Sequence, residues 1–212
     1  MSIFGRTPPF RHQTITGHAE NFFIHDGYEI RKPEHLVPYN DTGLRDEFQL
    51  PVYLYAREVL DHFGLSRVFD VGCGSGYKLI TNFYPFETIG IDLADTIHHV
   101  RTQYPDRKWF TPDDDLSRFV EFGANLTICS DVIEHVWDPN ELLNYLKVLT
   151  PRALVLSTPD RNQMTNGTFD GPPHNLAHIR EWSMIEFHDL VETHFVIDEH
   201  FSAGGTQIAL CH

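Results

Sequence analysis

Short apolar runs and amphipathic stretches alternate along most of this chain. A helical pattern begins near Phe48, its apolar residues recur with the spacing of one buried face, and Gly64 ends it. Apolar runs of strand length then alternate with further helical patterns, which is typical of a parallel sheet with helices on both faces. We therefore predict an α/β fold with a seven-stranded, mostly parallel sheet. The expected strands are residues 67–71, 88–92, 108–110, 124–130, 153–157, 194–197 and 206–211.

The remaining pattern divides the chain into an extension and one domain. The last expected strand follows Gly204-Gly205, a turn that suits an antiparallel return. Residues 1–47 lack periodicity and contain several prolines, so we interpret them as an irregular extension that covers the ligand site, and residues 48–212 as a single domain. The expected helices are residues 48–63, 77–82, 95–103, 139–149 and 181–192, and the first should bury Tyr53, Ala56, Val59, Leu60 and Phe63.

Composition narrows the class of protein. The chain has 212 residues, of which 41% are hydrophobic and 22% are charged, as expected for a soluble globular domain. No apolar run approaches the ~20 residues that span a bilayer, so no membrane partner is expected. The net charge of −14 argues against a nucleic-acid partner, because such binding neutralises phosphates with basic side chains. The odd set of Cys73, Cys129 and Cys211 indicates reduced thiols and a cytoplasmic protein.

The turn after the first strand has the features of a ligand site. The run VFDVGCGSGY at residues 68–77 leads from a strand through Asp70 to Gly72, Gly74 and Gly76. Glycines let the backbone turn sharply and let a ligand lie directly on the main chain. The helix that follows points free N–H groups and the positive end of its dipole at the same place. The run lacks the third glycine of the dinucleotide fingerprint and the Gly-Lys-Ser/Thr of a P-loop, so it predicts a different nucleotide-type ligand.

Asp92 ends the second expected strand, about twenty positions after Gly72. That spacing places a carboxylate at the tip of the neighbouring parallel strand, where it can accept both hydroxyls of a ribose. The alternative is that Asp92 caps the following helix. We favour the ribose role because the spacing and the glycine turn agree.

An acidic residue two positions before G-x-G-x-G resembles motif I of class I S-adenosylmethionine (SAM) methyltransferases. The resemblance covers roughly residues 48–212 and implies a Rossmann-like form of the sheet, with SAM lying across residues 72–76. In this interpretation the methionine end of SAM approaches Asp70, Gly72 and Ser130. The implied cofactor-binding residues are Asp70, Gly72, Gly74, Gly76, Asp92, Leu93 and Ser130.

The run Asp113-Asp114-Asp115-Leu116 follows the third expected strand. An acid followed by an aliphatic residue here resembles the methyltransferase position that binds the adenine amino group. Asp115 with Leu116 fits this position best, and Asp114 is nearly as good. A run of three acids is otherwise an ordinary solvated loop, and the sequence leaves both interpretations open.

A second group of reactive side chains follows the fourth expected strand. In Ser130-Asp131-Val132-Ile133-Glu134-His135-Val136, one helical turn would place Asp131, Glu134 and His135 on one face, while the valines and the isoleucine pack inward. Two carboxylates and an imidazole at the crevice of an α/β sheet can form a divalent metal site.

This run is similar to that of the ubiquinone-biosynthesis O-methyltransferases. Its pairing with the later His178-Ile179-Arg180-Glu181-Trp182 resembles the small-RNA 3′-terminal 2′-O-methyltransferases. The resemblance implies a Mg or Mn ion held by Asp131, Glu134, His135 and His178, with Asp131 in place of a glutamate. The alternatives are a metal-free catalytic role for His135 or His178, or a purely structural turn and a loop histidine bonded to the backbone.

The resemblances imply a SAM-dependent methyltransferase with Asp131, Glu134, His135 and His178 as its catalytic residues. Small acceptors with vicinal hydroxyls, such as a sugar, a glycan intermediate or a catechol, suit the expected layout. The alternatives are a metal-free C- or N-methyltransferase and a non-catalytic SAM-binding protein. Four aromatic residues of the extension and the loop at 159–180 are expected to form a lid over the acceptor. These aromatic residues are Phe22, Phe23, Tyr28 and Tyr39.

Overall fold

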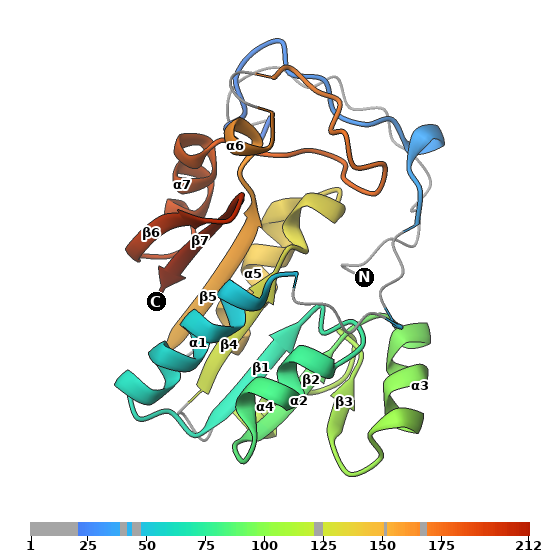
Figure 1. Ribbon diagram of the computed structural model, residues 1–212, viewed down its shortest axis with the longest axis vertical. Helices are drawn as coiled ribbons and strands as arrows, with labels where there is room; N and C mark the ends of the chain where they lie inside the picture. Colours follow the sequence, from blue (N-terminus) through green and yellow to red (C-terminus); the bar gives the residue numbers. More distant parts are fainter. Residues whose placement is uncertain (1–20, 39–41, 44–47, 121–124, 151, 166–168) are drawn as a thin grey trace.

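The computed structural model describes residues 21–38, 42–43, 48–120, 125–150, 152–165 and 169–212. Its centre is one seven-stranded sheet in the order β3-β2-β1-β4-β5-β7-β6 (Figure 1). The first five strands are parallel, and β7 runs antiparallel to both β5 and β6. The predicted α/β class and the antiparallel last strand are therefore confirmed. The strands are β1 Arg67–Val71, β2 Glu87–Ile91, β3 Lys108–Phe110, β4 Asn125–Ser130, β5 Ala153–Pro159, β6 Ile197–Ala203 and β7 Thr206–Cys211.

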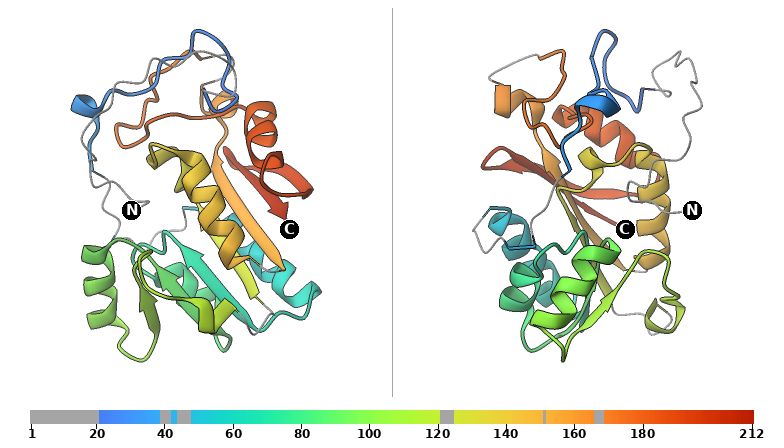
Figure 2. Two further views of the ribbon diagram at one scale, coloured as in Figure 1. Left: turned by 180° about the vertical axis from the view of Figure 1, so that it is seen from behind. Right: turned by 90° about the vertical axis from the view of Figure 1, so that its right-hand side faces the viewer.

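Two hydrophobic cores lie on opposite faces of this sheet, because side chains alternate between the faces along each strand. In β1, for example, Val68 belongs to one core and Phe69 to the other. The first core is shared with α1, α2 and α3, and the second with α4, α5 and α7, so helices cover both faces (Figure 2). The helices are α1 Leu50–His62, α2 Tyr77–Phe83, α3 Ala94–Gln103, α4 Ser117–Val120, α5 Pro139–Leu149, α6 Arg161–Thr165 and α7 Met184–Glu192.

The structure corrects several predicted elements. β6 spans Ile197–Ala203 and not residues 194–197, because His194 and Phe195 belong to the turn that follows α7, and their N–H groups donate to the carbonyl of Val191. α7 begins at Met184 and not at residue 181, since Ser183 and Glu186 form a capping box there. The short helices α4 and α6 were not predicted, and Phe63, expected on the buried face of α1, is 49% exposed.

Two segments that lie far apart in the sequence run side by side above the carboxyl ends of the parallel strands (Figures 1 and 2). We call the first, residues 21–38, the strap and the second, residues 169–182, the roof loop. Their main chains are joined by hydrogen bonds from Glu29 N to Asp170 O, from Arg31 N to Ile179 O and from Val37 N to Leu176 O. The strap therefore depends on the roof loop for its position. The proposed boundary at residue 47 stays a prediction, and Tyr39 lies outside the described residues.

Candidate active site

The glycine turn connects β1 to α2 in a conformation that requires glycine. Gly72, Gly74 and Gly76 have φ values of 78°, 52° and 70°, in the left-handed region that side chains with a Cβ avoid. A Cβ on Gly72 would overlap Val132, the second residue after β4. The turn is therefore packed closely against the segment after β4, and of its three glycines only Gly72 is partly exposed.

Asp92 follows β2 and faces this turn. Its Oδ2 accepts a hydrogen bond from Gly74 N at 2.8 Å, and its Oδ1 accepts one from Leu93 N at 2.6 Å. The N-cap of α3 is Leu93, so Asp92 does not occupy the capping position that the alternative interpretation gave it. The carboxylate instead stands at the tip of β2, bonded to the main chain of the glycine turn.

A cavity of about 340 Å³ opens at this place. It brings together four of the predicted cofactor-binding residues. The strap closes one side of it with Pro33, Leu36, Val37 and Pro38. Its size lies in the range of small-molecule sites. The predicted residues that line it are Gly72, Asp92, Leu93 and Ser130.

The other predicted cofactor residues lie outside the lining of this cavity. Asp70 is buried beneath it and accepts a hydrogen bond from the Tyr53 hydroxyl at 3.0 Å. Asp115 is exposed and accepts a hydrogen bond from Ser117 N at 3.0 Å, while Leu116 is buried in the core. The adenine contact with Asp115 and Leu116, and the contacts with Asp70, Gly74 and Gly76, stay predictions.

Asp131 takes an unusual backbone conformation directly after β4. Its φ is 52°, and the 3₁₀ turn that follows spans Ile133–His135, so Asp131 lies before the turn. The expected single helical turn through Asp131, Glu134 and His135 is therefore wrong. The Asp131 carboxylate instead accepts a hydrogen bond from the Ser157 hydroxyl at 2.8 Å, at the end of β5.

Glu134, His135 and His178 converge on one point. Nε2 of His135 and Nε2 of His178 each lie 3.9 Å from Oε1 of Glu134. The three ligand atoms lie within 4.8 Å of one another, and no fourth metal-binding side chain joins them among the described residues. Asp131, the fourth predicted ligand, stands outside this set.

Hydrogen bonds behind the two imidazoles fix which nitrogen faces Glu134. Nδ1 of His135 donates to the carbonyl of Ala177 at 2.9 Å, and Nδ1 of His178 donates to Oε1 of Glu181 at 2.6 Å. A carbonyl and a carboxylate only accept, so Nδ1 carries the proton in both rings and each Nε2 offers a lone pair. Asn175 Nδ2 donates to Nε2 of His178 at 2.9 Å.

Burial controls the protonation of this group. Burial, and then the charge of Asp131, raise the pKa of Glu134 well above its usual range. Burial, and then His178, lower the pKa of His135 to about 4, so this imidazole is neutral at pH 7. The pKa of Asp131 is also raised by burial, against the hydrogen bonds of Ser157 and Gln49. Ionisation of Glu134 and Asp131 is therefore costly in this site unless a nearby cation offsets their negative charge.

A second cavity of about 240 Å³ lies next to the first and contains these side chains. It is lined by Glu134, His178 and Glu181, and by residues of α6 and the roof loop. Gln49, Asp131 and His135 line both cavities and therefore form the boundary between them.

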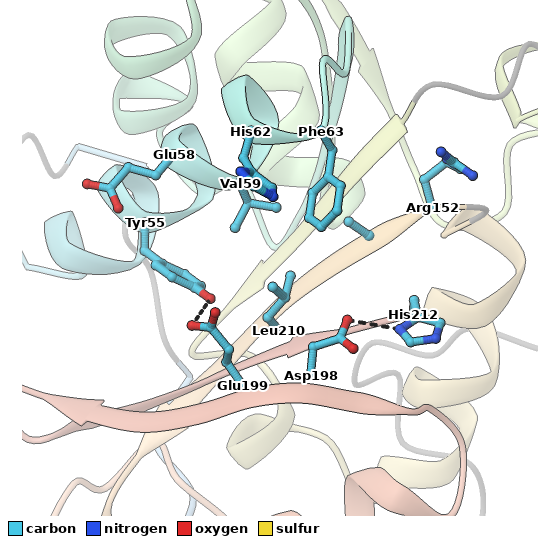
Figure 3. Close-up of a pocket in the computed structure, with 11 residues that line it drawn as sticks. Tyr55, Glu58, Val59, His62, Phe63, Arg152, Asp198, Glu199, Leu210 and His212 are labelled. Carbon is cyan, nitrogen blue, oxygen red and sulfur yellow. Dashed lines mark hydrogen bonds and ion pairs between the residues drawn. The ribbon is translucent and has the colours of Figure 1, made fainter.

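A third cavity, of about 730 Å³, lies between α1 and the β6–β7 pair (Figure 3). None of the predicted site residues lines it. Two of its three acidic side chains, Glu199 and Asp198, are held by the Tyr55 hydroxyl at 2.8 Å and by the His212 imidazole at 2.9 Å, and the third is Glu58 (Figure 3). We assign no role to it.

Sequence analysis gave no role to two residues of this site. Glu181 belongs to the His178–Trp182 run that carried the resemblance, and it holds His178 across a three-residue spacing. Gln49 reaches the site only through tertiary structure, because it contacts Ser130, which lies 81 positions later in the chain.

Comparison with known proteins agrees with this architecture. Residues 34–202 match the model of a family described as a methyltransferase domain. A probable S-adenosylmethionine-dependent methyltransferase of Mycolicibacterium smegmatis is 32% identical over 131 residues, which are 59% of this chain and 50% of that protein. The chain therefore spans about half the length of this curated relative.

Two solved structures share the fold at low sequence identity. The PH0226 protein from Pyrococcus horikoshii OT3 has a TM-score of 0.61 at 16% identity, over 82% of this chain and 94% of that one. The methyltransferase domain of the bacterial protein CtHen1-C has a TM-score of 0.59 at 21% identity, over 78% of this chain and 98% of that one. The family match covers most of the sheet and its crevice. The chain therefore belongs to the methyltransferase domain family, as its resemblance to class I SAM-dependent methyltransferases implied.

Proposed function

We propose that this protein transfers a methyl group from SAM to a hydroxyl of a small acceptor with two adjacent hydroxyls, and that a divalent Mg or Mn ion assists. SAM would occupy the 340 Å³ cavity and the acceptor the neighbouring 240 Å³ cavity. The curated relative is named as SAM-dependent, which supports the choice of cofactor.

The observation that carries the metal part of the proposal is Oε1 of Glu134. This oxygen is buried and has no hydrogen-bond partner among the described residues, while the other carboxylate oxygen accepts from the Thr158 hydroxyl at 3.0 Å. A buried carboxylate oxygen without a partner is costly, yet here it faces Nε2 of two imidazoles. Nε2 of His178 also accepts a hydrogen bond from Asn175, which a bound ion would replace. One oxygen and two nitrogen donors suit a divalent cation. The residues present therefore fit the ion.

The ion would be held by Glu134, His135 and His178, and Asp131, which lines the same cavity, would act through water. When bound, such an ion lowers the pKa of a hydroxyl and orients adjacent oxygens. The chain itself would do the rest. Asp92 and the glycine turn hold the nucleoside, and the strap and roof loop exclude water. Positioning of donor and acceptor alone is worth roughly 7–11 kcal/mol.

A metal-free mechanism is the second candidate, and His135 favours it. Its Nε2 is unprotonated, its pKa is about 4, and it lines both cavities. Such an imidazole could accept the proton of an acceptor hydroxyl, or assist C- or N-methylation, as a general base, and its low pKa makes it a weak one. A SAM-binding protein without catalysis is the remaining alternative.

The net charge of −14 supports a small, uncharged or cationic acceptor and no nucleic-acid partner. None of the described helices is both long and apolar enough to cross a bilayer. Cys73, Cys129 and Cys211 are buried free thiols, which supports a reducing compartment such as the cytoplasm.

The test is methyl transfer by the purified protein from SAM to catechols and cis-diol sugars, with Mg²⁺, Mn²⁺ or EDTA. O-methylated product and S-adenosylhomocysteine (SAH) are measured by mass spectrometry. Metal-assisted O-methylation requires product that EDTA abolishes, that added Mn²⁺ restores, and that Glu134→Gln eliminates. Product that persists in EDTA selects the metal-free mechanism, and intact SAM with every acceptor contradicts the proposal.

A further inference from the structure

Gln49 stands at the boundary between the two cavities. It is the residue before α1, is half-buried, and lines both the cofactor cavity and the neighbouring cavity. Asp131 and His135 are the other two residues shared by both linings. A methyl group that passes from one cavity to the other must therefore face this group of three side chains.

The side chain of Gln49 contacts the end of β4 directly. Its Nε2 donates a hydrogen bond to the carbonyl of Ser130, the last residue of that strand, at 3.3 Å. Asp131, the next residue, lines the same two cavities as Gln49. The carboxylate of Asp131 accepts a hydrogen bond from the Ser157 hydroxyl, so Gln49 and Ser157 act on adjacent residues at the boundary.

The backbone gives an independent sign that this junction is constrained. Gln49 and Asp131 have φ values of 66° and 52°, and only Phe22 and Phe23 share this property among the non-glycine residues that the structure describes. Left-handed conformations of such residues cost roughly 1–3 kcal/mol each and persist at sites where the surroundings require them. Two of these four residues meet where the cavities join.

We infer that Gln49 is a positioning residue for methyl transfer: it holds the Ser130 carbonyl at the boundary, next to Asp131, and so sets where the methyl group of SAM faces the acceptor. The inference rests on the proposed assignment of the two cavities to cofactor and acceptor. It does not depend on the metal or on the methylated atom.

Two substitutions separate positioning from folding. Gln49→Asn retains the amide and tolerates the left-handed conformation, but it is one methylene shorter. Gln49→Gly removes the side chain and relieves the backbone conformation, so the protein should remain folded. Gln103→Asn, at the exposed end of α3, is the matched control.

The measurement that needs no acceptor is the NMR spectrum of SAM carrying ¹³C in its methyl group. The resonance of bound SAM should shift in Gln49→Asn and Gln49→Gly and not in the control, while the affinity for SAM changes less than about tenfold. With an acceptor that the wild type methylates, kcat should fall by about 100-fold in Gln49→Gly with an unchanged KM for SAM, as expected when reacting groups are misplaced.

An unchanged methyl resonance in both variants would overturn the inference. Loss of SAM binding in Gln49→Asn would also overturn it, because Gln49 would then be part of the cofactor site itself. Failure of the proposed O-methylation is a separate result, seen as missing product with the wild-type protein, and it leaves the NMR comparison intact.

Discussion

His135 and His178 lie edge to face, with ring centroids 4.8 Å apart, and both turn Nε2 toward the same oxygen of Glu134. They come from segments more than forty residues apart, the turn after β4 and the roof loop. The main chain joins these segments as well, since Ile179 N donates to Glu134 O at 2.9 Å. The cluster of Glu134, His135 and His178 is therefore assembled by the docking of the roof loop on the turn after β4.

Asp92 is expected to determine cofactor affinity. Asp92→Ala removes the carboxylate that faces the glycine turn and frees Gly74 N. Because hydrogen bonds to a charged group contribute roughly 1.5–3 kcal/mol, SAH should bind about 10–100-fold more weakly. Isothermal titration calorimetry measures this, with Asp95→Ala on the exposed face of α3 as the control. Equal SAH affinities in the wild type and Asp92→Ala would show that the ribose assignment is wrong.

Glu134→Gln should stabilise the metal-free protein while abolishing its response to metal. Burial raises the folded-state pKa of Glu134, so the folded state holds the proton more tightly than the unfolded state. The free energy of unfolding therefore falls as pH rises from the unfolded pKa toward the raised folded value, and glutamine removes this loss.

Thermal melts of the metal-free proteins at acidic and alkaline pH test this prediction for Glu134. The variant should melt higher than the wild type at alkaline pH, and Mn²⁺ should raise the melting temperature of the wild type only. Glu141→Gln, at an exposed position of α5, is the control. A variant that Mn²⁺ still stabilises would exclude Glu134 as a ligand.

Glu181 is expected to act on metal affinity through His178. Its Oε1 accepts the Nδ1 proton of His178 at 2.6 Å and so holds Nε2 toward Glu134. Loss of such an orienting partner costs about 10–100-fold in metal affinity. Glu181→Ala should weaken Mn²⁺ binding by this factor in an electron paramagnetic resonance titration. Glu181→Gln retains an accepting oxygen and should be affected less; equal losses in both variants would mean that charge, and not orientation, matters.

The strap is expected to be held more firmly at acidic pH. Nδ1 of His25 lies 2.9 Å from Oε1 of Glu186 on α7, and Nε2 lies 2.9 Å from Oδ1 of Asp170 on the roof loop. Arg161 also faces this group, paired with Glu186 at 2.7 Å and 3.1 Å from Nδ1 of His25. The hydrogen bond to Glu186, and then the one to Asp170, raise the pKa of His25.

Because the pKa of His25 is raised in the folded state, its protonated form stabilises the folded protein. This contribution is fully present below the unfolded pKa of 6.5 and is lost as the pH rises through the folded pKa. His25→Gln should therefore remove a fall in melting temperature that the wild type shows from about pH 6 to 8. His99→Gln, exposed on α3, should retain the fall. The same fall in melting temperature with pH in the wild type and in His25→Gln would show that His25 does not hold the strap through its charge.

How far the sequence predicts this molecule depends on the range of the contacts involved. The strands β1 and β3 and the turn at Gly72 follow from local patterns, because periodicity and glycine spacing report local backbone geometry. The left-handed conformation of Asp131 does not follow from a local pattern, since the carboxylate of Asp131 is held by Ser157 of the neighbouring strand β5. The same applies to β6, a half-exposed strand whose weak apolar pattern begins only after a turn.

Candidate site residues divide in the same way. Glu134, His135 and His178 were predicted from motifs, and the structure brings them together. Gln49 and the links between strap and roof loop carry no motif, because they form between segments distant in sequence.

The pairing of strap and roof loop has a consequence for how this molecule changes over evolution. The cavity at Gly72 and Asp92 is built on strand ends, whereas the strap and the roof loop above it are joined to each other through main-chain atoms. If this cavity holds the methyl donor as proposed, mutations in the strap and the roof loop can change the entrance without changing how the donor binds. Residues of the two segments should then change together, so their covariation among relatives should reflect the choice of acceptor.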